Sequence, residues 1–398
     1  MQELFSDRIS DVPPSFIREI LKVTQDPTVI SFAGGLPSAA LFPTKAIQAA
    51  TQKVFETGGN EILQYSTTEG YGPLREYIAT RYRDKMGLEV NPDNILITNG
   101  SQQGLDLLGK ALLNEGDEVI IEAPGYLGAI QAFSIYRARF HAVPMDDAGM
   151  QVTPLQSTLA TARAKLMYTV PNFQNPSGIS YTNARRREVV EAMQDSRTLL
   201  IEDDPYGDIR FEGTRPDSFA SMMPERTILL GSFSKTVVPS FRLGWIVAPD
   251  SILEKLVIAK QASDLHTNYF SQRVLYQYLC DNDLDAHIEN IIDKYGRQRD
   301  TMLEAIGREF PDGIETTHPD GGMFLWVRLP EGYAARDLLQ KAIKDKVVFV
   351  PGDPFYVDGL AHNSLRLSFS TVDEATIAEG IKRLALAIRE LLQEGRAA

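Results

Sequence analysis

Cysteine is almost absent from this sequence, and histidine and long apolar runs are scarce as well. Cys280 is the only cysteine, so neither an intrachain disulfide nor a cysteine-rich metal site can form. The five histidines show no ligand-like spacing, and we expect no bound metal. No stretch approaches the roughly 18 apolar residues that a membrane-spanning helix needs. The sequence therefore predicts a protein without an intrachain disulfide, a bound metal or a membrane-spanning helix.

Basic residues are also outnumbered, 40 against 53 acidic ones, which gives a formal net charge of −13. This excess of negative charge disfavours nucleic acid and anionic membrane surfaces as partners, because both would repel it. Residues 1–8 carry no cationic start followed by an apolar core, so we expect no signal peptide and a cytoplasmic location.

Short apolar runs alternate with helical patterns between about residues 90 and 250. The expected strands are 94–98, 118–122, 165–170, 198–203, 227–231 and 244–248, and the helices include 102–113, 183–194 and 251–262. Hydrophobicity within these runs is continuous rather than alternating, which is typical of strands covered on both faces. The pattern predicts an α/β fold with a doubly wound, mostly parallel sheet.

The pattern changes after about residue 290. We expect a helix over 291–310, a strand at 322–327, a helix over 335–344, strands at 347–350 and 364–370, and a last helix from Asp373. This mixture predicts a smaller α+β lobe. The expected division is an N-terminal arm over residues 1–50 that joins the small domain, a large domain over 51–290, and a small C-terminal domain over 291–398.

The most informative segment is Gly-Ser-Phe-Ser-Lys-Thr-Val-Val-Pro-Ser-Phe-Arg, which ends at Arg242. Ser232, Ser234 and Arg242 can bind a phosphate, while Lys235 can form an imine with a carbonyl. Pyridoxal 5′-phosphate (PLP) carries both groups and is the leading candidate ligand. The alternative is an ordinary surface lysine, but Ser232 and Ser234 alternate along an extended segment and therefore share one side of it.

Polar side chains follow three of the other expected strands, at the ends where open α/β sheets bind ligands. Ser101 would begin a helix and could bind an anion there, although a plain helix cap is the commoner use. Tyr126 could stack on a pyridine ring, or simply pack within its loop. Asn175 could donate a hydrogen bond from a rigid turn, or only stabilise that turn.

Two acidic residues end the strand at 198–203. Asp203 closes an apolar strand, where an acid is costly unless it is paired. Opposite a ring nitrogen, it would keep that nitrogen protonated and make the cofactor an electron sink. Asp204 competes for this role on spacing alone, and Tyr206 could bond a ring hydroxyl.

Arg366 lies in the late strand at 364–370, among apolar neighbours. A guanidinium there could hold a carboxylate through two parallel hydrogen bonds. A surface arginine in a salt bridge is the alternative.

Taken in order, these segments resemble the fold-type I PLP-dependent aminotransferases over essentially the full length of the chain. The branch they resemble most contains the 2-aminoadipate (LysN-type) and kynurenine/aminoadipate aminotransferases. The matching segments are residues 30–37, 63–66, 70–75, 100–103, 171–178, 202–206 and 232–235, with Arg242 and Arg366.

The resemblance implies three catalytic residues. Lys235 forms the internal aldimine with PLP and later moves the proton between the substrate Cα and C4′ of the cofactor. Asp203 pairs with the pyridine nitrogen, and Tyr126 stacks on the ring. Asn175 and Tyr206, the third catalytic residue, bond the ring oxygen.

The resemblance also implies the residues that hold the phosphate and the substrate. Arg366 binds the substrate α-carboxylate, and Asn175 and the backbone of Gly35 line the substrate side. A homodimer is expected, in which Tyr65 reaches the phosphate of the neighbouring subunit. The remaining phosphate ligands are Ser101, Gln102, Ser232, Ser234 and Arg242.

The implied activity is transfer of the amino group of an L-amino acid to a 2-oxo acid by a ping-pong mechanism. The donor is of the 2-aminoadipate, glutamate, leucine or aromatic type, and the acceptor is 2-oxoglutarate. One alternative is a PLP-dependent lyase or racemase, because the fold does not choose the reaction. Another alternative is a non-catalytic effector-binding protein, because a related family of regulators joins this domain to an N-terminal winged helix. Here the aminotransferase motifs begin near residue 30, so we expect no winged helix before them.

Arg18 is a separate hypothesis about specificity. It lies in a capped amphipathic pattern after Pro13 and Pro14, where relatives that handle dicarboxylates place an arginine against the distal carboxylate. The alternative is an exposed helix arginine paired with a glutamate.

Overall fold

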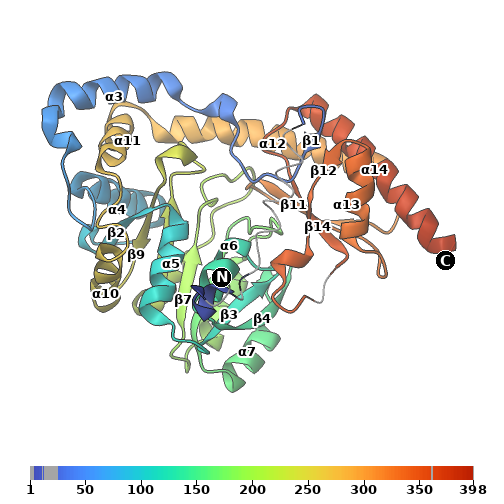
Figure 1. Ribbon diagram of the computed structural model, residues 1–398, viewed down its shortest axis with the longest axis horizontal. Coiled ribbons are helices and arrows are strands. Elements are labelled where there is room, and N and C mark those ends of the chain that lie inside the picture. The colour runs from blue at the N-terminus through green and yellow to red at the C-terminus, as the bar shows by residue number, and fades with distance from the viewer. Residues whose placement is uncertain (1–3, 11, 13–25, 360–361, 398) are drawn as a thin grey trace.

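The computed structural model describes residues 4–10, 12, 26–359 and 362–397. Its centre is an eight-stranded sheet with the order β2-β9-β8-β7-β6-β3-β4-β5 (Figure 1). Neighbouring pairs from β8 through β4 are parallel, whereas β9 and β5 run against the rest. The expected α/β class with a mostly parallel sheet is confirmed. The strands are Ile95–Asn99 (β2), Glu118–Ala123 (β3), Arg139–Asp146 (β4), Gly149–Met150 (β5), Ala164–Thr169 (β6), Leu199–Asp203 (β7), Thr227–Ser232 (β8) and Leu243–Val247 (β9).

The sheet is covered on both faces, as its continuous apolar runs predict. Successive strand residues enter different apolar clusters: Ile121 and Ile201 belong to one, and Ile120 and Leu200 to another. Because side chains alternate across a strand, both faces must be packed. The helices of this region are Ser101–Leu112 (α5), Leu127–Ser134 (α6), Val152–Thr161 (α7), Asn183–Ala192 (α8), Phe219–Met222 (α9) and Asp250–Gln261 (α10).

A second, antiparallel sheet with the order β10-β11-β14-β13 lies at the other end of the molecule, among the orange and red elements of Figure 1. The helix α12 that leads into this sheet begins at Leu284 and not at the expected residue 291. It therefore crosses the boundary expected at residue 290 between the large and the small domain. The elements are Leu284–Glu309 (α12), Glu315–Thr316 (β10), Phe324–Arg328 (β11), Ala335–Lys344 (α13), Val350–Pro351 (β13), Ser364–Ser368 (β14) and Glu374–Ala397 (α14).

The single strand expected at 347–350 is wrong. Val347–Val348 (β12) pairs in parallel with Ile30–Ser31 (β1), while β13 pairs with β14 in the antiparallel sheet. The chain therefore passes from one sheet to another at Phe349, whose side chain is fully buried. This arrangement ties the segment near residue 30 to the C-terminal lobe.

The end of the molecule far from the antiparallel sheet consists mainly of helices. There the helix Thr44–Gly58 (α3) packs against Tyr269–Asp281 (α11), and Gly72–Met86 (α4) lies beside them (Figure 1). Short 3₁₀ segments lie at Ala39–Leu41, Gly59–Leu63, Pro92–Asn94, Pro224–Arg226, Pro239–Phe241 and Asp353–Phe355, and a four-residue helix at Asp7–Ser10 (α1).

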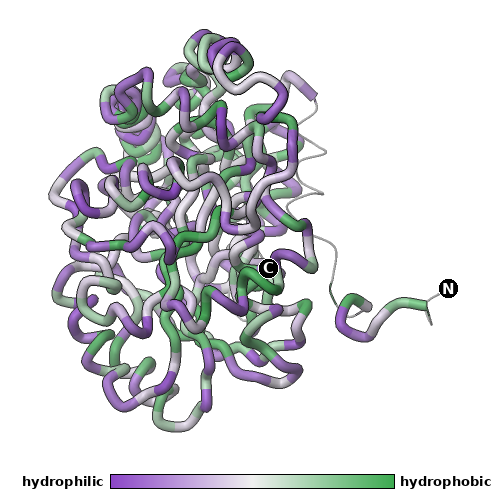
Figure 2. Tube along the Cα trace, turned by 90° about the vertical axis from the view of Figure 1, so that its left-hand side faces the viewer, coloured by the Kyte–Doolittle hydropathy of each residue, from purple (hydrophilic) through white to green (hydrophobic). Residues whose placement is uncertain are grey.

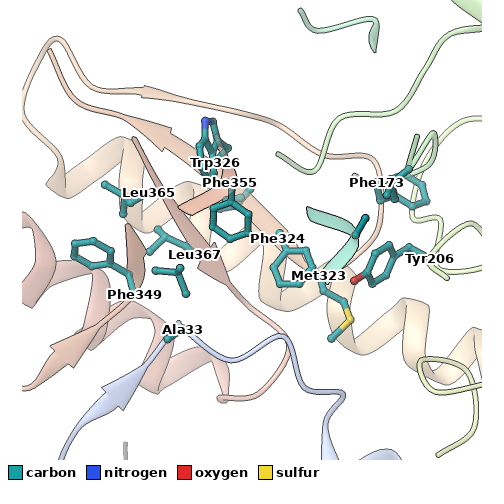
Figure 3. Close-up of a cluster of buried hydrophobic side chains, with 14 of the residues drawn as sticks. Ala33, Phe173, Tyr206, Met323, Phe324, Trp326, Phe349, Phe355, Leu365 and Leu367 are labelled. Carbon is teal, nitrogen blue, oxygen red and sulfur yellow. The ribbon is translucent and has the colours of Figure 1, made fainter. Parts of the chain in front are cut away.

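The main apolar core joins the two sheets. Phe173 and Tyr206, from the large sheet's loops, belong to the same cluster as Phe324 and Trp326 of β11 and Leu367 of β14 (Figure 3). Hydrophilic stretches follow the outer helices, and residues 4–10 stand out from the body (Figure 2). Within the described ranges, no helix has the length and apolar character needed to cross a membrane. The continuous core fixes the small lobe against the ends of the large sheet's strands.

Candidate active site

A cavity of about 270 Å³ lies where the parallel strands end and the small lobe begins. Its lining residues come from seven separate parts of the sequence, and most of them follow strand ends, as the rule for open α/β sheets predicts. The sequence-predicted residues that line it are Gly35, Ser101, Gln102, Tyr126, Asn175, Asp203, Tyr206, Ser232, Ser234, Lys235, Arg242 and Arg366. Lining residues that sequence reasoning missed are Gly100, Tyr168, Val170 and Pro205.

Lys235 follows β8 in the turn that the sequence singled out. Its Nζ donates a hydrogen bond to the backbone oxygen of Gly35 at 2.7 Å. Burial lowers the pKa of this amine to about 8, and the positive charges of Arg366 and Arg242 contribute to the same shift. An amine with such a pKa is partly neutral near pH 7 and can act as a nucleophile or a base.

Asp203 is the last residue of β7, and its carboxyl group is buried at the wall of the cavity. Its Oδ2 accepts a hydrogen bond from the Tyr168 hydroxyl at 2.7 Å, whereas Oδ1 has no partner among the described residues. Burial raises the pKa of Asp203 to about 7, the Tyr168 hydrogen bond lowers it, and the charge of Asp204 raises it. A buried carboxylate oxygen without a partner is costly, so it fits a ligand that donates a proton there.

Asp204, the competing acid, faces away from this cavity. Its Oδ2 binds Arg215 at 2.5 Å and its Oδ1 accepts from the backbone nitrogen of Gly207 at 2.9 Å. The structure thus separates two adjacent acids that spacing alone could not distinguish.

One end of the cavity is built for an anion. Gly100, with φ of +74°, leads into α5, whose first residues Ser101 and Gln102 place backbone N–H groups at the cavity. A Cβ atom on Gly100 would lie 2.5 Å from Nη2 of Arg242, so only glycine lets this guanidinium approach. A helix N-terminus beside an arginine suits a phosphate group.

Arg366 forms the other end of the cavity. Its Nη1 donates to Oδ1 of Asn175 and its Nη2 to the backbone oxygen of Ala33, both at 2.7 Å, while Nε has no partner among the described residues. Its guanidinium lies over the ring of Phe324, 4.4 Å from the centroid, and over that of Phe355, at 5.3 Å; both rings appear in Figure 3. Burial lowers the pKa of Arg366 to about 10, so it stays cationic near neutral pH.

Asn175 is held by a buried hydrogen-bonded turn. Gln174 donates to Oε2 of Glu122 at 2.9 Å, and its Oε1 accepts from the hydroxyl of Ser177 at 2.6 Å. Tyr181 donates to Oε1 of Glu122 at 2.8 Å. Asn175 itself donates to the Tyr206 hydroxyl at 3.5 Å, so both side chains face the same part of the cavity.

Tyr65, which is expected to serve the neighbouring subunit, does not line the cavity of its own chain. Tyr65 is 77% exposed, and its ring meets His266 edge-on at 5.8 Å rather than any cavity residue. Arg18 lies outside the described residues. In the described part of the chain, no group of three or more histidine, cysteine, aspartate or glutamate side chains could hold a metal ion.

The cavity has the chemistry of a site for pyridoxal 5′-phosphate. The anion end at Gly100, the amine of Lys235 and the unpartnered oxygen of Asp203 match a phosphate, an aldehyde and a pyridine nitrogen, in that order. A buried amine and a buried carboxylate oxygen without a partner are both costly in the absence of a ligand. The residues present therefore fit pyridoxal 5′-phosphate.

Comparisons with known proteins agree with this geometry. The family profile described as aminotransferase class I and II matches residues 28–384. The aromatic-amino-acid aminotransferase 1 of Thermococcus litoralis is 41% identical over 99% of this chain and 96% of its own.

Two solved structures are similar over nearly their whole length. The kynurenine aminotransferase of Pyrococcus horikoshii, in complex with PMP, has a TM-score of 0.94 and 41% identity, covering 98% of each chain. LysN, the α-aminoadipate aminotransferase of Thermus thermophilus, complexed with N-(5′-phosphopyridoxyl)-L-leucine, has a TM-score of 0.92 and 39% identity, covering 98% of this chain and 99% of its own.

Proposed function

Because this chain belongs to the class I and II aminotransferase family and is a PLP-dependent transaminase, we propose that it transfers the amino group of large L-amino acids to 2-oxoglutarate. The proposed donors are 2-aminoadipate, glutamate, leucine and aromatic amino acids. Support comes from the named relatives, whose names refer to aromatic amino acids, kynurenine and α-aminoadipate. The observation that carries the proposal is one cavity holding an amine, a buried acid and two arginines.

The proposed cofactor site uses the groups at the strand ends. Ser101, Gln102, Ser232, Ser234 and Arg242 would hold the phosphate, and Tyr126 would cover the ring. When bound, the protonated ring would withdraw electrons from the substrate Cα and so make loss of its proton easier. Asp203 would keep the ring nitrogen protonated, and Asn175 and Tyr206 would bond the ring oxygen. Burial raises the pKa of Tyr206 above its usual range, so this tyrosine remains a hydrogen-bond donor.

Lys235 is the proposed base. Its amine, with a pKa of about 8, can take a proton from the substrate Cα and return it, because both protonation states are accessible near neutral pH. The Gly35 oxygen, 2.7 Å from Nζ, orients the amine on the substrate side of the cavity. One base would thus serve both halves of a ping-pong cycle.

Arg366 is the proposed site for the substrate α-carboxylate. Its guanidinium is already fixed by Asn175 and by the Ala33 backbone, so little freedom is lost on binding. The rings of Phe324 and Phe355 exclude water from this end, which strengthens the pairing of opposite charges.

A homodimer is part of the proposal, as is the cytoplasmic location. Three exposed side chains are Leu63 by 68%, Tyr65 by 77% and Leu265 by 48%. Leu265 follows Asp264, which accepts a hydrogen bond from Asn99 beside the turn at Gly100. The backbone of Ser66 bonds His266, so these side chains come from adjoining segments. An exposed apolar patch beside the site suits a second copy of the chain, and Tyr65 could then reach the partner's phosphate.

The experiment that tests the function is a half-reaction screen. The holoenzyme is mixed with single amino acids without any oxo acid, and the absorption spectrum of the cofactor is recorded. True donors convert the cofactor to its amine form, and 2-oxoglutarate restores the aldehyde form. A lyase would instead release product without an acceptor, and a racemase would leave the cofactor unchanged; either result would reject the proposal.

A further inference from the structure

Tyr168 is a buried tyrosine at the cavity that has no role in the function proposed above. It lies in β6, where its partner in β7 is Ile201, two residues before Asp203. Residues two apart in a strand point to the same face, so the pairing brings the phenol and the carboxyl group together. Their oxygen atoms lie 2.7 Å apart, and neither side chain is more than 2% exposed.

The two oxygens of Asp203 have different surroundings. Oδ2 accepts the Tyr168 hydroxyl, and Oδ1 has no partner among the described residues and belongs to the cavity wall. Without Tyr168, the structure offers this carboxyl group no other side-chain donor in the described ranges. An ionised carboxylate in that position would then be strongly disfavoured.

Tyr168 is held as a constant donor. Its ring stacks on Tyr126 with centroids 6.5 Å apart at 26°, and meets the edge of Phe133 at 6.3 Å and 75°. Burial raises its pKa well above the usual value, so the hydroxyl keeps its proton. The hydrogen bond in turn lowers the pKa of Asp203 against the effect of burial.

We propose that Tyr168 is a positioning residue: its hydroxyl fixes Asp203 with Oδ1 toward the cavity and favours the ionised carboxylate that keeps the cofactor's ring nitrogen protonated. This inference rests on the proposed role of Asp203. Tyr168 acts only through that carboxyl group and needs no contact with the substrate.

A matched control exists in the same large domain. Tyr181 is equally buried and donates to Oε1 of Glu122 at 2.8 Å. Burial raises the pKa of Glu122 to about 7, as it does for Asp203. Glu122, however, keeps two other donors, the Val170 backbone and Gln174, and does not line the cavity.

The experiment compares Tyr168→Phe, Tyr181→Phe, Asp203→Asn and the Tyr168→Phe/Asp203→Asn double variant. Each apoenzyme is loaded with PLP labelled with ¹⁵N at the ring, and the ¹⁵N resonance and the PLP dissociation constant are measured. Tyr168→Phe should move the resonance toward that of unprotonated pyridine and weaken PLP binding about tenfold, the effect of losing a hydrogen bond to a charged group. Tyr181→Phe should leave the resonance in place.

The outcomes separate the two proposals. Tyr168→Phe should add little in the Asp203→Asn background, because both changes act on one pair. If Asp203→Asn shifts the resonance and Tyr168→Phe does not, the inference about Tyr168 is overturned while the role of Asp203 stands. If Asp203→Asn itself leaves the resonance unchanged, the proposed role of Asp203 fails, and that of Tyr168 with it. The wild-type resonance, which needs no variant, must be that of a protonated ring; otherwise both fail.

Discussion

The amine of Lys235 is buried near the guanidinium groups of Arg366 and Arg242, and this environment determines the pH at which the amine loses its proton. With a pKa of about 8, roughly one amine in ten is neutral at pH 7, and the neutral fraction rises as the pH passes through 8. Reductive methylation of the apoenzyme should therefore label Lys235 with a midpoint near pH 8. Arg366→Met should move the midpoint upward, because a positive charge that disfavours the ammonium form is lost.

The labelling is read by peptide mass spectrometry, with Lys255 as the internal reference, since its side chain is 62% exposed. A midpoint for Lys235 equal to that of this exposed lysine would contradict the assigned environment. The same peptide, after borohydride treatment of the holoenzyme, should carry the pyridoxyl group.

Arg366 should be sensitive even to a conservative change. Replacement by lysine keeps the charge but loses the planar fork that contacts Asn175 and Ala33. We expect kcat/KM for the amino donor to fall by roughly 10- to 100-fold, mostly through KM, from the loss of a paired charged hydrogen bond. Steady-state kinetics with Arg328→Lys as the control should show no such fall, because Arg328 is exposed on the neighbouring strand. Equal effects of the two changes would argue against a carboxylate site at Arg366.

At the scale of elements, tight binding of phosphate at the turn between β2 and α5 should depend on glycine at position 100. Gly100→Ala would place a methyl group 2.5 Å from Nη2 of Arg242, at a backbone φ of +74°. Gly332→Ala is the matched control, since Gly332 has φ of +89° but no atom within 4 Å of the added carbon. The positive φ should cost each variant about 1 kcal/mol of unfolding free energy, measured by denaturant titration, and the contact with Arg242 should add to this cost only in Gly100→Ala.

Only Gly100→Ala should weaken the binding of inorganic phosphate and of PLP to the apoenzyme, by about tenfold or more in calorimetry. Equal binding by the two variants would show that the phosphate is held elsewhere.

Elements with continuous apolar runs could be predicted from the sequence, and those without them could not. β8 and β7 were predicted within one residue because their side chains are buried on both faces. β4 was missed, since Arg139 and His141 interrupt its apolar pattern and Pro144 lies within it. The split between β12 and β13 was missed because a run of four apolar residues carries no sign that it serves two sheets.

The residues of the site also divide into those that the sequence could predict and those that it could not. Residues in recognisable turns, such as Lys235 and Asn175, were predicted, and the structure places them in one cavity. The preference for Asp203 over Asp204 came from the resemblance, because the pairing of Asp204 with Arg215, eleven residues later, depends on the folded loop and not on spacing. Tyr168 was missed, although a tyrosine inside a buried strand has to find a hydrogen-bond partner.

At the scale of the whole molecule, the proposed dimer makes a prediction about shared sites. If Tyr65 serves the partner's phosphate, a hybrid of a Lys235→Ala subunit and a Tyr65→Ala subunit contains one fully native site. Random mixing of the two variants by unfolding and refolding should then restore about a quarter of wild-type activity, with native PLP affinity, because half the dimers are hybrids with one good site.

No recovery on mixing beyond the activity of the Tyr65→Ala variant itself would mean that Tyr65 serves its own subunit, and a fully active Tyr65→Ala variant would mean that it serves no site. Sedimentation velocity provides the companion measurement. Leu63→Lys should shift the protein toward the monomer, whereas Leu386→Lys should not, although Leu386 is also exposed, by 53%, on α14.

The pairing of β1 with β12, and the bond from Arg366 to Ala33 across 333 positions, also order events on the ribosome. While the chain is being made, Ile30 and Phe32 leave the exit tunnel long before Val347 and Val348 have been translated. They must wait without their strand partner, as apolar segments that a chaperone could hold. The end of the cavity at Arg366, where we propose that the substrate carboxylate binds, is therefore among the last parts to form, after Lys235 and the rest of the large sheet have emerged.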